Sequence, residues 1–252
     1  MEIEIWSDVV CPWCYIGKRR LEKALASFEQ RDRVRLIWRS FQLDPSAPRE
    51  AHERVSAVLA RKYAISRAEA EAMNARVSAL AAQEGLIFHL DQARYCNTFD
   101  AHRLLHLAAA HDQAQELAER LWRAYFSEGA VLSEPGTLYR LASEVGLPEP
   151  EVALVLQSSA YSEAVRADER RAHELGVQGV PFFLFAGRYA VSGAQPVPLL
   201  RRVLERAWRE SAQEPPQLVT AAEARAAQEQ ICSDESCALP GSENVDQGKG
   251  SA

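Results

Sequence analysis

The sequence contains no long apolar run and no excess of basic residues. No stretch of its 252 residues is apolar enough over a sufficient length to span a bilayer. The first ten residues, MEIEIWSDVV, have neither the basic nor the apolar region of a secretory leader. We therefore expect a cytoplasmic protein without a membrane partner. The formal net charge is -6 and the basic residues are scattered, which gives no support for nucleic acid as a partner.

Cysteine is scarce, with five residues in the chain, which excludes a small protein held together mainly by disulfides. Two of the five, Cys11 and Cys14, lie in the short motif CPWC. In a reducing compartment, so close a pair is typical of a catalytic dithiol or a metal site rather than a structural disulfide. A zinc site usually has about four ligands, and no second Cys-X2-Cys or His-X3-5-His pair lies at a compact distance. We therefore expect no metal ion.

Strand-like alternation occurs near both ends of the sequence. Residues 2–7 (EIEIWS) and 33–40 (RVRLIWRS) alternate apolar and polar side chains, and apolar residues recur at helical spacing between them. This pattern predicts a βαβ unit with CPWC at the junction of the first strand and the helix. Residues 180–185 (VPFFLF) and 189–191 (YAV) predict a β-hairpin, followed by a helix at 197–208.

Between these two regions the sequence is rich in Ala, Leu and Glu at helical spacing. We therefore predict an α/β fold with a large all-helical insertion at 46–159. Residues 1–45 and 160–212 would form one discontinuous domain, whose strands pair because two strands alone make a marginal sheet. Residues 213–252 would form a C-terminal extension, with a weakly anchored helix at 220–230 and a disordered end.

The expected position of CPWC at the start of a helix has consequences for its thiol chemistry. With Cys11 at the N-cap, Pro12 occupies the first helical position, which tolerates proline, and Cys14 lies one turn into the helix. Cys-X-X-Cys thiols at helix N-termini have pKa values of about 3.5–7, a shift larger than the helix dipole alone provides. Hydrogen bonds from first-turn amides and from the second thiol should supply the remainder. We expect Cys11 to be the nucleophile and Cys14 to resolve the mixed disulfide.

Several segments together resemble one known family. CPWC, residues 95–108 (YCNTFDAHRLLHLA), 176–185 (GVQGVPFFLF) and 191–196 (VSGAQP) are similar to the DsbA-like branch of the thioredoxin superfamily, and within it to the FrnE-like group. That group is related to 2-hydroxychromene-2-carboxylate isomerases and kappa-class glutathione transferases. The resemblance covers about residues 1–210. It implies a thioredoxin-fold thiol–disulfide oxidoreductase that acts on protein thiols and disulfides.

The resemblance also implies roles for particular residues. Pro181 would be cis and would lie against the cysteine pair. The backbone of Val180 would pair with a substrate peptide as an added strand. Asn97, His102 and Arg103 would line the groove beside the active site.

The relatives that use glutathione carry serine in place of the first cysteine, whereas this sequence keeps both Cys11 and Cys14. We therefore expect dithiol chemistry, as a reductase or isomerase, without an organic cofactor. Glutathione or a thioredoxin-type protein would be the reductant. Two alternatives stay open: a glutathione-dependent transferase or isomerase of small molecules, and a zinc-binding or chaperone-like module without catalysis.

A second cysteine pair, Cys232 and Cys237, lies near the C-terminus in ICSDESCALPG. A disulfide at this Cys-X4-Cys spacing requires a turn, which Ser, Asp and the following Pro-Gly allow. The pair is either two stray exposed cysteines or a redox relay, and some FrnE-like proteins carry such an extension. The acidic neighbours Asp234 and Glu235 make these thiols poorer leaving groups than the first cysteine of CPWC. We therefore expect electrons to pass from the tail pair to the CPWC disulfide.

Further expectations concern single side chains. Cys96 should be a small buried apolar residue. Trp13 should be exposed beside the sulfurs as a substrate contact, because it precedes the part of the helix that packs. His102 and His106 lie four residues apart without an evident third ligand, so we expect them in the core or on the surface rather than at a metal. The weakly anchored helix at 220–230 would allow a homodimer.

Overall fold

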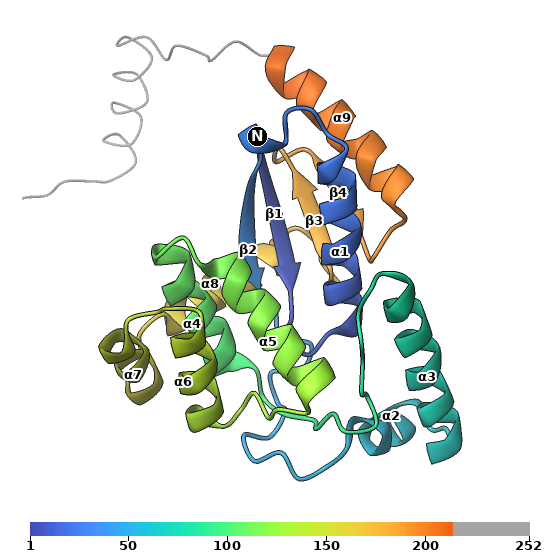
Figure 1. Ribbon diagram of the computed structural model, residues 1–252, viewed down its shortest axis with the longest axis vertical. Coiled ribbons are helices and arrows are strands. Elements are labelled where there is room, and N and C mark those ends of the chain that lie inside the picture. The colour runs from blue at the N-terminus through green and yellow to red at the C-terminus, as the bar shows by residue number, and fades with distance from the viewer. Residues whose placement is uncertain (214–252) are drawn as a thin grey trace, which may run out of the picture. The chain divides into compact units, whose positions relative to one another are not determined.

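Four strands form one mixed sheet in the part of the chain that the computed structural model describes, residues 1–213. They are β1 (Glu2–Ser7), β2 (Arg35–Ser40), β3 (Phe182–Phe185) and β4 (Tyr189–Ser192), and their order in the sheet is β2-β1-β3-β4. β1 runs parallel to β2 and antiparallel to β3, and β3 and β4 form a hairpin (Figure 1). Strands from both ends of the described chain therefore pair, as predicted.

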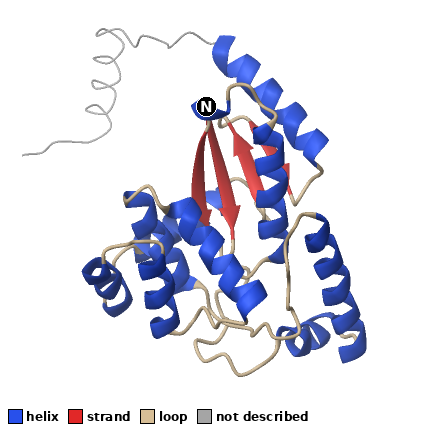
Figure 2. Ribbon diagram, in the orientation of Figure 1, coloured by secondary structure: helices blue, strands red, loops and turns tan. Residues whose placement is uncertain are grey.

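Helices cover the sheet and fill the sequence between β2 and β3 (Figure 2). In chain order they are α1 (Pro12–Ala26), α2 (Val55–Tyr63), α3 (Arg67–Gln83), α4 (Phe99–Ala110), α5 (Ala114–Glu128), α6 (Pro135–Glu144), α7 (Glu149–Gln157), α8 (Ser162–Glu174) and α9 (Val197–Gln213), with a short 3-10 turn at Arg31–Arg33. α2 to α7 occupy the stretch where the helical insertion is predicted. None of the helices in the described part of the chain is long and apolar enough to cross a bilayer.

The alternation of side chains in β1 explains how the sheet is covered. Ile3 and Ile5 lie on one face, where they share a core with apolar side chains of α1 and α9. Trp6 lies on the other face and packs against α8. Because both faces are covered, β1 is buried from its second residue to its end. The segment that follows β1 therefore starts from a fixed position.

Some boundaries differ from those predicted. The second strand begins at Arg35 rather than at residue 33, because Arg31–Arg33 form a 3-10 turn. α9 continues to Gln213, past the predicted end at residue 208. The predicted helix at 220–230 lies outside the described residues. The division of residues 1–212 into two domains stays a prediction.

α5 fixes the N-terminal half of α1. Tyr15 of α1 stacks on Trp122 of α5, with ring centroids 5.4 Å apart. Trp122 Nε1 also donates a hydrogen bond of 3.1 Å to the carbonyl oxygen of Asp8, which lies just before CPWC. One turn further along α1, Lys18 Nζ donates to Glu119 Oε2 of α5 over 2.7 Å. These contacts hold the start of α1, and hence the cysteine pair, against the helical region.

Candidate active site

Cys11 and Cys14 occupy the start of α1, as predicted. Cys11 is the N-cap residue with extended backbone (φ -89°, ψ 112°), and Pro12 follows in the first helical turn. Cys11 N donates to the carbonyl oxygen of Asp8 over 3.1 Å, and Cys14 N donates to the carbonyl oxygen of Cys11 over the same distance. Both side chains are buried free thiols. The turn therefore holds two reduced sulfurs at one end of the helix.

The loop before β3 closes over Cys11. The Val180–Pro181 peptide bond is cis, as the resemblance implies. The Cys11 thiol donates to the carbonyl oxygen of Val180 over 3.5 Å, across 169 positions of sequence. A glycine of α1 permits this approach, since a Cβ on Gly17 would lie 2.9 Å from Pro181 Cγ and 3.3 Å from Phe183 Cζ. Two distant segments therefore meet at the Cys11 sulfur.

The hydrogen bonds expected from the first-turn amides of α1 to the Cys11 sulfur are not formed in this reduced state. The Cys11 side chain makes no capping hydrogen bond with the N–H groups of the first turn. As a thiol, its sulfur carries a hydrogen, which it donates to the carbonyl oxygen of Val180 instead. A thiolate has no hydrogen to donate and is repelled by a carbonyl oxygen. The sulfur must therefore change hydrogen-bond partners when it loses its proton.

Cys14 is a thiol at neutral pH. Burial is the main cause that raises the pKa of Cys14 well above its ordinary value, and the hydrogen bond with Cys11 and the charge of Cys11 raise it further. A hydrogen bond from the backbone of Asp8 acts in the opposite direction. A residue that holds its proton in this way is suited to attack late, after the first sulfur has reacted.

Asp8 is a buried carboxylate behind the dithiol that sequence reasoning missed. Its Oδ2 accepts a hydrogen bond from Leu43 N over 2.8 Å. Its Oδ1 lies 3.3 Å from Nε2 of His102, whose ring is completely buried. Its carbonyl oxygen accepts from both Trp122 and Cys11. The sequence feature that could have identified Asp8 is its position in SDVVCPWC, as a polar residue between a buried strand and CPWC.

The other expected groove residues serve the helical region. Asn97 Oδ1 accepts a hydrogen bond from the first backbone N–H of α4 over 3.0 Å. Arg103 is buried, and its guanidinium donates to three carbonyl oxygens at and after the end of α7, those of Val155, Ser158 and Ala160. Asn97, His102 and Arg103 are not among the residues that line the cavity beside Cys11. His102 contacts that lining through Asp8, beside its ring, and through Thr98, whose carbonyl oxygen accepts a hydrogen bond from His102 N.

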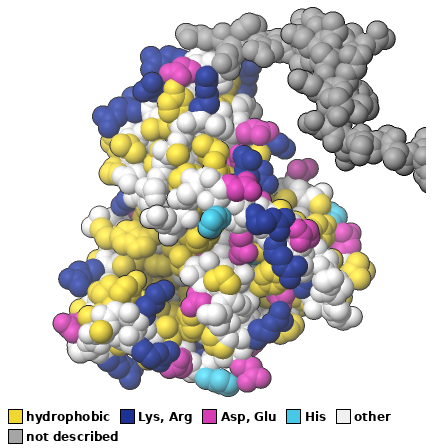
Figure 3. Space-filling model, turned by 180° about the vertical axis from the view of Figure 1, so that it is seen from behind, with side chains coloured by type: hydrophobic (Ala, Val, Ile, Leu, Met, Phe, Trp, Pro, Cys, Tyr) yellow, Lys and Arg dark blue, Asp and Glu magenta, His cyan; other side chains and the backbone are white. Residues whose placement is uncertain are grey.

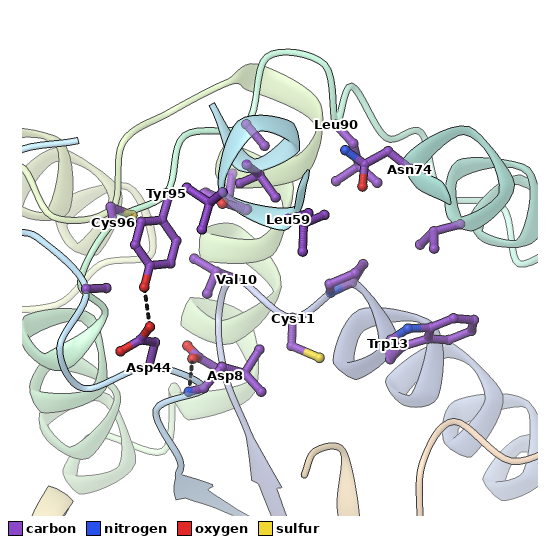
Figure 4. A pocket seen from close by; sticks show the side chains of 18 of the residues that line it. Asp8, Val10, Cys11, Trp13, Asp44, Leu59, Asn74, Leu90, Tyr95 and Cys96 are labelled. Atoms are coloured by element: carbon purple, nitrogen blue, oxygen red, sulfur yellow. Dashed lines mark hydrogen bonds between the residues drawn. The ribbon is translucent and has the colours of Figure 1, made fainter. Parts of the chain in front are cut away.

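This cavity has a volume of about 380 Å³. One side of it is the CPWC segment, and the other side is formed by α2, α3 and the segment after α3; Figure 4 labels Val10, Cys11, Trp13, Leu59, Asn74 and Leu90 among its residues. Gly179 and Val180 of the loop before β3 also line it. Trp13 is 38% exposed, as predicted, and lines the same cavity. The reactive sulfur and an open apolar space are therefore neighbours.

Two groups on the cavity wall hold their protons. Tyr95 donates its hydroxyl hydrogen to Asp44, and burial together with that hydrogen bond raises the pKa of Tyr95 to about 12. Cys96 is buried, as predicted, and burial raises the pKa of its thiol to about 11. Because the thiolate is the reactive form, Cys96 is a poor nucleophile at neutral pH.

The histidine pair of α4 has separate partners. His106 Nε2 lies 3.1 Å from Asp168 Oδ2, whereas His102 faces Asp8. Within residues 1–213, no group of three or more His, Cys, Asp and Glu side chains is arranged to hold a metal ion. The predicted relay cysteines, Cys232 and Cys237, lie outside the described residues.

The chain is similar to proteins of known structure. A "probable DsbA oxidoreductase" from Streptomyces coelicolor is 42% identical, with 88% of this chain and 94% of that one covered and a TM-score of 0.83. The cytosolic disulfide reductase DsbM from Pseudomonas aeruginosa is 19% identical and shares the fold, with 83% and 99% of the two chains covered and a TM-score of 0.58.

A curated relative and a family match extend this comparison. The uncharacterized protein YwbO of Bacillus subtilis (strain 168) is 25% identical over 196 residues, which are 77% of this chain and 90% of YwbO. The family described as DSBA-like thioredoxin domain matches residues 2–205, a range that includes the sheet, the CPWC helix and the helical region. The expected resemblance to DsbA-like proteins is confirmed, and the chain belongs to the DSBA-like thioredoxin domain family.

Proposed function

We propose that this protein is a thiol–disulfide oxidoreductase that acts on protein disulfides, as a reductase or isomerase, through Cys11 and Cys14. The family supports thiol–disulfide oxidoreductase chemistry in general. The observation that carries the proposal is the pair of free thiols at the start of α1, with the loop of cis-Pro181 in contact with Cys11 through Val180.

In the proposed reaction, the Cys11 thiolate attacks one sulfur of a substrate disulfide. The substrate S–S bond breaks, its other sulfur leaves as a thiolate that takes up a proton, and Cys11 becomes joined to the substrate. Cys14 then loses its proton and attacks the Cys11 sulfur, which releases the second substrate thiolate. The protein dithiol is oxidised by two electrons and the substrate disulfide is reduced. In isomerisation, a substrate thiolate attacks the mixed disulfide instead and Cys11 leaves as a thiolate.

We assign the substrate and the supply of electrons to different parts of the chain. The substrate segment runs along the backbone of Val180 and contacts Trp13, which is exposed next to the first cysteine. Glutathione or a thioredoxin-type protein returns the oxidised pair to the dithiol in the cytoplasm. Cys232 and Cys237 act as the relay that passes those electrons to the disulfide of Cys11 and Cys14.

Reduction of insulin disulfides and reactivation of scrambled ribonuclease test the protein-disulfide activity. Cys11→Ser should abolish both activities, because no sulfur remains to attack the substrate. Cys14→Ser should impair net reduction and accumulate mixed disulfides of Cys11, because the resolving thiol next to Cys11 is missing. A wild-type protein that shows neither activity, with its thiols confirmed free, would refute the proposal.

The alternative functions give different results in simple assays. For a glutathione-dependent transferase or isomerase of small molecules, Cys11→Ser would retain or improve glutathione conjugation while disulfide exchange is lost. For a zinc-binding module, protein purified under reducing conditions would contain stoichiometric zinc. We expect loss of conjugation together with exchange, and no zinc.

A further inference from the structure

β2 is an edge strand, and within the described sheet it pairs with β1 alone (Figure 1). Arg35 N donates to the carbonyl oxygen of Met1 over 2.9 Å, which sets the alternation along the strand. Because alternate residues of a strand turn their N–H and C=O groups to opposite sides, those of Leu36 and Trp38 point away from β1. Neither N–H group has a hydrogen-bond partner in residues 1–213. β2 therefore offers a free edge to another strand.

A groove of about 580 Å³ lies along this free edge. Its floor is residues 34–38, one wall is the end of α1 with the turn after it, and the other wall is the turn from α4 to α5. At the far end of β2, Asp168 Oδ2 accepts a hydrogen bond from Ser40 N over 2.9 Å and so closes the edge there. We call this surface the β2 groove; its lining includes Leu25, Leu36, Trp38, Ala109, Asp112 and Glu116.

The β2 groove is separate from the cavity beside Cys11, because the two share no lining residue. Figure 3 shows hydrophobic side chains gathered beside α2 and α3, and these two helices contribute to the cavity, not to the groove. A partner in the β2 groove therefore does not occupy the cavity at the thiols.

The shape of the groove selects its occupant. Strand pairing needs the two backbones to approach to about 4.8 Å. A second copy of this chain would bring the same two walls with it, and they would meet the walls of the first copy before the two β2 strands could pair. An extended segment without such walls can reach the backbone of Leu36 and Trp38. Its side chains on one face would also cover these half-buried apolar residues.

The charges of the groove favour basic side chains in that segment. Asp112 and Glu116 are exposed on the wall formed by α4 and α5, and neither has an ion-pair partner in the described part of the chain. Arg31 and Arg35, the two arginines of the groove, each already pair with a neighbouring carboxylate. Glu22 already binds two basic side chains of α1. The charges left open are therefore two carboxylates, which complement Lys or Arg.

We propose that the β2 groove binds an extended segment of a protein partner as a fifth strand beside β2. The N–H groups of Leu36 and Trp38 donate to its carbonyl oxygens, and a Lys or Arg of the segment pairs with Asp112 and Glu116. Apolar side chains at alternate positions of the segment pack on Leu36 and Trp38. This contact does not involve the sulfur of Cys11, so it goes beyond the proposed disulfide exchange.

A cysteine-free peptide tests this proposal on the full chain: fluorescein-labelled Lys-Val-Thr-Val-Thr-Val-Lys-amide, with binding measured by fluorescence anisotropy. Two versions carry N-methyl groups, one on the three valines and the other on the two threonines. Only one of these two sets of N–H groups faces β2 in a paired strand. We expect one version to bind at least about tenfold more weakly than the parent peptide, and the other to bind within about threefold of it.

Hydrogen exchange followed by NMR locates the bound peptide. At saturation, exchange of the N–H groups of Leu36 and Trp38 should slow by at least about tenfold, because each then has an acceptor. Ile37 is the internal control, since its N–H already faces β1 and should keep its rate.

Charge variants test the role of the two carboxylates. Asp112→Asn combined with Glu116→Gln should weaken binding of the parent peptide by about three- to tenfold. Glu50→Gln combined with Glu163→Gln makes the same change of net charge at exposed carboxylates outside the groove, and should keep the wild-type affinity.

Each outcome decides a separate point. No binding of the parent peptide at about 1 mM, or equal affinity of the two methylated versions, would overturn strand addition at β2. Protection of Val180 in place of Leu36 and Trp38 would locate the peptide in the cavity and would also overturn it. A dimer of the chain alone in sedimentation, with both edge amides protected, would make a second copy the occupant and overturn the proposed partner. Equal effects of the two pairs of charge substitutions would overturn the role of Asp112 and Glu116.

Discussion

A single glycine of α1 controls how closely the two halves of the candidate site approach. A Cβ at Gly17 would lie 2.9 Å from Pro181 Cγ, a separation that real Cβ contacts do not show. We predict that Gly17→Ala displaces the loop that carries Pro181, destabilises the protein by about 1–3 kcal/mol and slows disulfide exchange. Urea unfolding and the rate of hydroxyethyl disulfide reduction measure the two effects.

Gly136→Ala in α6 is the matched control, because nothing lies within 4 Å of the added Cβ. Alanine favours helices over glycine by up to about 1 kcal/mol, so both substitutions would stabilise the protein if contacts did not matter. Equal stability of Gly17→Ala and Gly136→Ala would contradict the predicted clash.

Cys14 should make the second step of exchange strongly dependent on pH. Burial, the hydrogen bond with Cys11 and the charge of Cys11 raise the pKa of Cys14 in the free dithiol. Capture of Cys11 in a mixed disulfide removes that charge but leaves the burial, so Cys14 still reacts from the thiol form. We predict that resolution accelerates by close to tenfold per pH unit between about pH 7 and pH 8.5, since only the thiolate attacks.

In a chain that carries Cys232→Ser and Cys237→Ser, Ellman's reagent separates the two steps, because Cys11 releases the first chromophoric thiol and Cys14 the second. The second phase should disappear when Cys14→Ser is added to this chain. A second phase in the wild type whose rate does not change with pH would contradict the prediction.

The residues of the site differ in how far the sequence specifies them. Cys11, Pro12 and Cys14 could be placed at the start of a helix because capping rules are local. Asp8 was missed because its partner His102 lies far along the chain. The contact of Gly17 with Pro181 could not be predicted either, since it depends on how two distant segments approach each other.

At the scale of elements, one carboxylate joins α1 to α5. Burial alone would raise the pKa of Glu119, but hydrogen bonds from Lys18 and Tyr15 outweigh it and hold the pKa below its ordinary value. A depressed folded-state pKa contributes stability above the unfolded-state pKa, and this contribution is lost as the pH falls through the folded-state pKa. We predict that Glu119→Gln destabilises the protein by about 1–2 kcal/mol at pH 7.

Urea unfolding at several pH values measures this difference, which should shrink as the pH falls below about 4.5. Glu163→Gln in α8 is the control, because Glu163 also pairs with an arginine but is 72% exposed, so little change is expected. A cost for Glu119→Gln that is the same at pH 7 and at low pH would show that the interaction is not ionic.

The elements themselves were largely predictable where their periodicity is regular. β1 spans residues 2–7 as predicted, because its alternating side chains are buried on both faces. The turn at Arg31–Arg33 was missed because its last residue, Arg33, continues the alternating pattern of the strand that follows. The partners of Arg103, carbonyl oxygens at and after the end of α7, could not be read from the sequence, because they lie more than 50 residues further along the chain.

At the scale of the whole molecule, pairing of strands from both ends of the chain was predictable, whereas the cavity was not. Short strands need partners to bury their faces, so β1 and β3 had to meet. The cavity is formed by CPWC, α2, α3 and the loop at Val180, which come together only in the folded chain. No local pattern in any one of these segments indicates a cavity.

The tail cysteines provide a prediction for the complete chain. If Cys232 and Cys237 deliver electrons to the CPWC disulfide, a mixed disulfide with Cys11 must form on the way. We predict that Cys14→Ser accumulates a Cys11 link to one of the two, which peptide mapping by mass spectrometry identifies. Cys96 serves as the internal reference, since it is buried and should remain free. Absence of any Cys11 link to the tail would remove the relay from the proposal.

The separation of CPWC from α2 and α3 has a consequence for how such a protein diversifies. The sulfurs and the loop that contacts them come from residues 11–14 and 179–181, whereas much of the cavity wall comes from residues 55–77. Substitutions in α2 and α3 would therefore reshape the wall of the cavity while the sulfurs and the loop that contacts them stay in place.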